Sequence, residues 1–150
     1  MNAWSHLPNA EHIDTILADA MARPEVWAGA FVIPFGTPWS LAQDTAWGTA
    51  CRTAWIAAQD AVRRAAWIAA QDAVRRAAWL AVWQEVRDTV WAAAQSALWD
   101  AIRTLIAWDE SAALLDLTPD ALRTIIDVAD GDVKHQAALL LPAVIARRTP

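Results

Sequence analysis

The chain has 150 residues, of which 57% are hydrophobic, and a net charge of −5. This apolar content is enough for a sizeable buried core and argues against a disordered chain. Residues 40–108 carry a charge of +1 between two segments of −3 each, and so nearly neutral a centre is a poor electrostatic match for nucleic acid.

The first 36 residues are expected to form a helical N-terminal segment. Asn9 is a plausible N-cap for a helix over residues 10–23. Apolar residues share one face of this helix at helical spacing: Ile13, Ile16, Leu17 and Ala20. Pro24 is expected to end this helix or to start the next one. Residues 33–38 contain Pro and Gly and are predicted to form a connector.

Residues 42–105 form sixteen consecutive four-residue repeats, here called tetrads. The first residue of each tetrad is Ala, Val, Leu or Ile, and the second is Trp, Gln or Arg except at Cys51. The sequence AWIAAQDAVRRA at 54–65 recurs unchanged at 66–77. No Gly or Pro occurs between residues 49 and 118, whereas Thr37 followed by Pro38 is a strong helix start signal. The second segment, residues 37–108, is therefore predicted to be one helix with few or no breaks.

A period of four does not match the turn of an α-helix. Four residues advance about 400°, so each tetrad rotates the apolar stripe by about 40° relative to the preceding one. An eleven-residue repeat already gives a right-handed supercoil, and a period of four lies further in that direction. The predicted fold class is all-α, with a long Trp-rich tetrad-repeat helix in a right-handed supercoil and small helical end pieces. A solenoid of short strands is the rival geometry, although β-branched residues are scarce.

Eight of the eleven tryptophans lie in the predicted long helix: Trp47, Trp55, Trp67, Trp79, Trp83, Trp91, Trp99 and Trp108. Together they could bury on the order of 1,200–2,000 Å². A single helix of about 105 Å and its end pieces cannot cover that area. Either the repeat folds back on itself or other copies of the chain cover it. Because the repeat lacks a Gly or Pro hinge, we expect these eight residues to mediate homo-oligomer formation.

Residues 109–150 are predicted to form a helical C-terminal cap. The pair of capping hydroxyl and proline recurs at 118–119 and should open a helix that Gly131 closes. A last helix over residues 133–146 is expected to bend or end near Pro142.

The sequence contains residue types that act in catalysis, but they do not occur in the combinations and spacings that catalytic sites require. His6, His12 and His135 lack the spacing of a zinc site, and Cys51 lacks a partner histidine in the sequence pattern. Phosphate-binding loops and serine-nucleophile motifs are also missing. We therefore predict no catalytic, cofactor-binding or metal-binding residues, no cofactor or small-molecule substrate, and no enzymatic activity.

The tetrads of the A-W-x-A type over residues 42–108 resemble short-period repeat tracts of uncharacterised bacterial and phage proteins. This resemblance implies no activity, cofactor or site.

The sequence favours a structural protein that self-associates through its Trp/Ala tetrads. The alternative is a module that binds a ligand or single-stranded nucleic acid through the Trp and Arg residues at the second tetrad position, although the charge balance disfavours nucleic acid. A small regulatory or immunity-type protein remains open as a third class. No uncharged window is long enough for a membrane span, and no signal peptide is recognised. We expect a cytoplasmic protein, and its single cysteine suits a reducing compartment.

Overall fold

A computed structural model describes residues 4–36, 41–83 and 88–150, which form helices and no strand, so the predicted all-α class is confirmed. The elements in chain order are α1 (Ala10–Ala22), α2 (Pro24–Gly36), α3 (Leu41–Ala57), α4 (Ala61–Trp83), α5 (Asp88–Ala107), the 3-10 helix η1 (Asp109–Asp116), α6 (Pro119–Val128) and α7 (Asp132–Arg148). Among these helices, none combines the length and the apolar character that a bilayer crossing requires.

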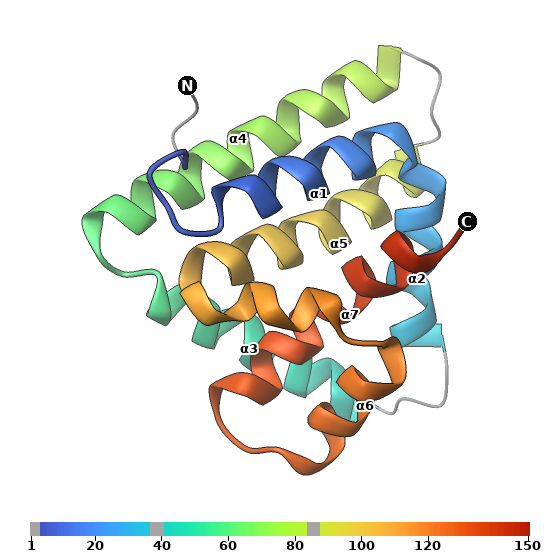
Figure 1. Cartoon of the computed structure of the whole chain (residues 1–150). Helices are drawn as coiled ribbons and strands as arrows, with labels where there is room; N and C mark the ends of the chain where they lie inside the picture. Colours follow the sequence, from blue (N-terminus) through green and yellow to red (C-terminus); the bar gives the residue numbers. More distant parts are fainter. Residues whose placement is uncertain (1–3, 37–40, 84–87) are drawn as a thin grey trace.

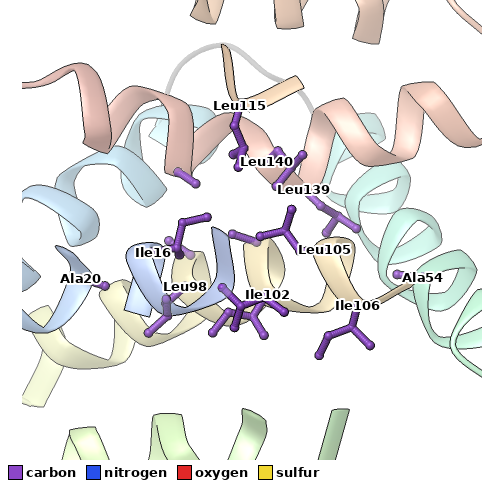
Figure 2. Packing of buried hydrophobic residues seen from close by; sticks show 14 of the residues in the cluster. Ile16, Ala20, Ala54, Leu98, Ile102, Leu105, Ile106, Leu115, Leu139 and Leu140 are labelled. Carbon is purple, nitrogen blue, oxygen red and sulfur yellow. The ribbon is translucent and has the colours of Figure 1, made fainter. Parts of the chain in front are cut away.

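Helix α5 is the centre of the fold, and it packs against α1, α2, α3, α4 and α7. Figure 2 shows its residues Leu98, Ile102 and Leu105 among side chains from α1 and α7. Its fully buried side chains belong to one core that draws on every helix described. Helix α4 lies at the outer edge of the molecule and contacts mainly α5 and α1 (Figure 1).

The prediction of one long supercoiled helix over residues 37–108 is wrong. The described part of this block forms three helices of 17, 23 and 20 residues. Helices α4 and α5 run side by side in opposite directions (Figure 1), so the repeat covers much of its own apolar surface. The start signal at Thr37 and Pro38 lies outside the described residues.

The rotation of the apolar stripe explains why three short helices succeed where one long helix would not. Most residues described at the first tetrad position are buried, although Val62 at the start of α4 is exposed: Ala50 and Ala54 in α3, then Ala66, Ala70 and Val74 in α4, then Ala94, Leu98 and Ile102 in α5. Over three tetrads the stripe turns by only about 80°, so it stays on one side of the helix. Over sixteen tetrads it would visit every side, and no single neighbouring helix could cover it.

The break between α3 and α4 occurs without glycine or proline. Asp60 accepts a hydrogen bond from the backbone N–H of Arg63 through Oδ1 at 2.8 Å, as an N-cap does. The Arg63 guanidinium also reaches across to the end of α5, where it donates to the carbonyl of Ile106 and pairs with Asp109 at 2.7 Å. These contacts fix the start of α4 against α5.

Asp72 and Arg75 occupy the same places in the second copy of the duplicated dozen, yet they lie inside α4. The ion pair between Asp72 and Arg75 is longer than that between Arg63 and Asp109, at 3.8 Å, and both of its side chains are exposed. One twelve-residue sequence therefore adopts two backbone conformations in the same chain. The tertiary contacts of Arg63 distinguish the two copies, since their local sequences are identical.

The predicted elements at the two ends agree largely with the structure. The helix over 10–23 is confirmed as α1, and Thr118 caps α6 by accepting from the N–H of Ala121 at 3.1 Å. The connector at 33–38 is wrong over residues 33–36, because α2 continues through Pro34. Likewise α7 continues past Pro142 to Arg148, where the burial of the residues around the proline offsets the cost of about 3 kcal/mol of an interior proline.

Asn9 precedes α1 as predicted, but its side chain does not cap that helix. The buried amide Nδ2 instead donates to three carbonyls where α5 meets η1, those of Leu105, Trp108 and Asp109, at 3.0–3.2 Å. Leu105 lies in the last turn of α5, where carbonyls have no partner within the helix. Asn9 therefore ties the N-terminal segment to the central helix.

Candidate functional site

The eight tryptophans predicted to mediate self-association do not share one environment. Three are buried: Trp67, Trp91 and Trp108. Two are half-buried, Trp47 and Trp99, and two are exposed, Trp55 and Trp79. The side chain of Trp83 lies outside the described residues. Their common role in self-association stays a prediction.

Three of these indoles gather where α3, α4 and α5 meet. Trp67 packs edge-on against Trp55 and Trp99, with ring centroids 5.2 Å apart in each pair. The guanidinium of Arg103 lies 5.0 Å from the ring centre of Trp99 and 5.5 Å from that of Trp67. The cation of the chain itself therefore already occupies the space over these rings.

A buried carboxylate joins α3 to α5 beside this cluster. Asp100 accepts a hydrogen bond from Nε1 of Trp47 at 2.9 Å and faces the thiol of Cys51 at 3.8 Å. Nε of Arg103 lies 3.6 Å from the same carboxylate and makes no hydrogen bond, although it is buried. Nothing in the tetrad pattern identified Asp100, since the third tetrad position holds apolar, acidic and basic residues alike.

Burial is the main cause of the pKa shifts of Asp100 and Cys51. It raises the pKa of Asp100 to about 6, and this rise is limited by the nearby charge of Arg103 and by the hydrogen bonds from Trp47 and Cys51. Burial, followed by the charge of Asp100, raises the pKa of the Cys51 thiol to about 11. A thiol so reluctant to ionise is a poor nucleophile. The cluster is therefore suited to holding helices together rather than to covalent chemistry.

In the described ranges, other polar groups do not converge on a site. Among the described residues, no group of three or more His, Cys, Asp or Glu side chains is placed to hold a metal ion. A pocket of about 220 Å³ is lined by Glu11, His12, Thr15 and Arg147 and is open to solvent. Of the other two histidines, His6 is exposed and His135 is half-buried.

The outward side of α4 combines large apolar side chains with charges. Trp79, Leu80 and Ile68 are 64%, 53% and 52% exposed. Asp72, Arg75 and Arg76 lie between them in the sequence and are also exposed. We call these six residues the outer face of α4. At about 100° per residue, Ile68, Asp72 and Trp79 fall on one line opposite the buried residues of α4, the two arginines flank that line, and Leu80 lies about 100° from Trp79 at the border of the face.

Exposed apolar residues continue beyond this face on α3 and α4. Trp55, Ile56 and Val62 are each exposed by 44% or more. An apolar patch with interspersed charges is typical of an interaction surface rather than of a catalytic cleft. Comparison with protein-family models, curated proteins and solved structures finds no match to this chain, and the resemblance to bacterial and phage repeat tracts stays a prediction.

Proposed function

We propose that this chain is a small helical assembly protein that associates with copies of itself through the outer face of α4. The observation that carries the proposal is the exposure of Trp79 and Ile68 on one side of a helix whose other side is packed in the core, with exposed Leu80 at the border of that side. Burying such a side chain is worth about 1.5–3 kcal/mol. Association is the direct way to remove these three from water.

The apolar area available for self-association is smaller than the tetrad pattern alone predicted, because the fold buries Trp67, Trp91 and Trp108. One helix face offers less than the roughly 800 Å² per partner of a standard interface. We therefore expect association at micromolar or higher concentration rather than an obligate oligomer. A reducing compartment such as the cytoplasm suits the free thiol of Cys51.

Binding of single-stranded nucleic acid has less support from the geometry. Base stacking requires accessible aromatic rings next to cations. Trp67 is buried, and Arg103 lies over its ring. Arg63 pairs with Asp60 and Asp109. On α4, Trp79 is exposed near Arg75 and Arg76 in the sequence, so nucleic acid is an outcome that the experiment must separate.

The test is sedimentation velocity of the wild-type chain from about 10 µM to about 1 mM, a range set by the expected weak interface. We expect the sedimentation coefficient to rise with concentration. The double substitution Ile68→Ser with Trp79→Ser should abolish that rise. Val128→Ser is the matched control, because Val128 is 75% exposed on α6, away from the outer face.

A wild-type chain that stays monomeric over the whole range would overturn the proposal. Quenching of tryptophan fluorescence by single-stranded DNA that weakens steeply with salt, in a monomeric chain, would favour the nucleic-acid alternative instead.

A further inference from the structure

We infer that the partner of the outer face is α4 of a second copy in antiparallel orientation, with Ile68 against Trp79 and Asp72 against Arg75, and with Leu80 and Arg76 at the margins of these contacts. This inference rests on the proposed function and specifies its geometry. It predicts a two-fold dimer in which each contact occurs twice.

The order of residues along the outer face makes it complementary to itself. An apolar residue, Ile68, stands at one end, and the apolar pair of Trp79 and Leu80 stands at the other. The charges lie between, with Asp72 nearer the first end and Arg75 nearer the second. Reversing the direction of a second helix therefore brings apolar residues onto apolar residues and the acid onto the arginines.

The register follows from the spacing. In an antiparallel pair, residue i of one copy faces residue j of the other where i + j is constant along the helix. A constant of about 147 places Ile68 opposite Trp79 and Asp72 opposite Arg75. The apolar contacts then lie about 16 Å apart at the two ends, with the ion pairs between them.

Neighbouring registers place like charges together. Sliding one helix by a turn in one direction places Asp72 opposite Asp72 of the second copy. Sliding it by a turn in the other direction places Arg75 opposite Arg76 of the second copy. A parallel pair about a two-fold axis would also place each charged residue opposite its own equivalent. Like-charge contacts of this kind select against alternative pairings.

The charged residues are free to make these contacts. Among the described residues, Asp72 and Arg75 are joined by an exposed pair at 3.8 Å, with 55% and 63% of their side chains accessible. In the dimer each Asp72 would lie between its own Arg75 and that of the second copy. In contrast, Asp60 and Arg63, their equivalents in the first copy of the dozen, are committed to the capping of α4 and to the end of α5.

A charge-swap experiment tests the pairing. The first variant is Asp72→Arg, and the second combines Arg75→Asp with Arg76→Asp. Each variant alone should place like charges in the interface and raise the Kd of self-association by about tenfold or more. An equimolar mixture should form a heterodimer with a Kd within about threefold of the wild-type value, since every facing pair is again opposite in sign. Sedimentation velocity measures the affinities, and native mass spectrometry identifies the heterodimer by its mass.

The outcomes separate the pairing from the proposed function. If the mixture does not recover association while Ile68→Ser with Trp79→Ser still abolishes it, the antiparallel register is wrong and self-association through α4 stands. If the wild-type chain is monomeric, both are wrong. A monomer that binds vesicles of phosphatidylglycerol would assign the face to a lipid surface and would also overturn both. All five substituted positions are exposed, and circular dichroism of each variant confirms that it folds as the wild type does.

Discussion

Asp100 is the most strongly perturbed acid in the described part of the chain, and its environment makes folding depend on pH. Its carboxyl group is buried between α3 and α5, and burial raises its pKa to about 6. In an unfolded chain an aspartate titrates near about 3.9. The folded state therefore holds the proton more tightly than the unfolded state does. This group stabilises the fold most below about pH 4, and that contribution is lost as the pH rises through about 6.

The variant Asp100→Asn removes this titration. We expect the free energy of unfolding of the wild-type chain to fall relative to that of the variant as the pH rises from about 4 to about 7. Urea unfolding of both proteins at several pH values in this range measures the difference. The other carboxyl groups act on both proteins alike and cancel. A difference that stays constant with pH would show that Asp100 titrates normally.

The buried indole of Trp67 should dominate the stability of the α3–α4–α5 junction. Its side chain is 4% exposed and contacts Trp55, Trp99 and Arg103. Replacing a buried Trp by Ala leaves a large cavity, so Trp67→Ala should lower the free energy of unfolding by about 3–5 kcal/mol. Urea denaturation below the concentration of self-association is the measurement.

Trp79 occupies the same tetrad position three tetrads after Trp67, and it is the matched control. Because it is exposed, Trp79→Ala should change the free energy of unfolding of the monomer by less than about 0.5 kcal/mol. The tetrad pattern alone predicts equal effects for the two residues. Equal losses of stability would therefore contradict the burial described for them.

At the scale of the helices, identical sequences meet different neighbours. The dozen at 54–65 contains the break between α3 and α4, whereas its copy at 66–77 lies within α4. Local propensity is the same in both copies and cannot account for the difference. The contacts of Arg63 with the carbonyl of Ile106 and with Asp109 distinguish the first copy. Tertiary contacts of this kind override local preference where the preference is weak.

Arg63 and Arg75, which occupy equivalent positions in the two copies, test this explanation. Arg63→Ala should lower the free energy of unfolding by about 1–2 kcal/mol, because it removes hydrogen bonds to the end of α5 and leaves a carbonyl unsatisfied. Arg75→Ala, at the same place in the second copy, should change it by less than about 0.5 kcal/mol. Thermal or urea unfolding of the two variants under the same conditions gives the comparison. A larger effect at Arg75 would refute the role assigned to Arg63.

The same contrast marks the limit of prediction from the sequence. Local signals identified α1, α6 and the start of α7, because capping residues and apolar spacing act within a few residues. The drift of a four-residue period was also foreseen, but not the division of the repeat into α3, α4 and α5 that accommodates it. Asp60 and Asp72 have identical flanking residues over several positions, so no local rule can assign one to a cap and the other to a helix interior. The burial of Asp100 depends on which helices meet, which the tetrads do not encode.

At the scale of the whole molecule, the two longest helices of the repeat, α4 and α5, are similar in length and pack against each other. Helix α4 has 23 residues and α5 has 20, which correspond to about 34 Å and 30 Å. Helix α4 is thus long enough to lie along the whole of α5, which also packs against α1, α2, α3 and α7. The second copy of the duplicated dozen, residues 66–77, supplies about 18 Å of α4, more than half of the length of that helix.

Deleting residues 66–77 should therefore be severe, although the chain keeps one complete copy of the dozen. The deletion removes Trp67, Ala70 and Val74, all of them buried, and leaves α4 too short to cover α5. We expect the variant to keep helical far-ultraviolet circular dichroism, to lose cooperative unfolding, and to bind a fluorescent probe of exposed apolar surface such as ANS. Deleting residues 54–65 yields the identical polypeptide, so the experiment does not depend on which copy is regarded as removed. A cooperative transition within a few degrees of the wild-type Tm would mean that α5 finds equivalent cover elsewhere, and that the packing of α4 on α5 does not hold the fold together.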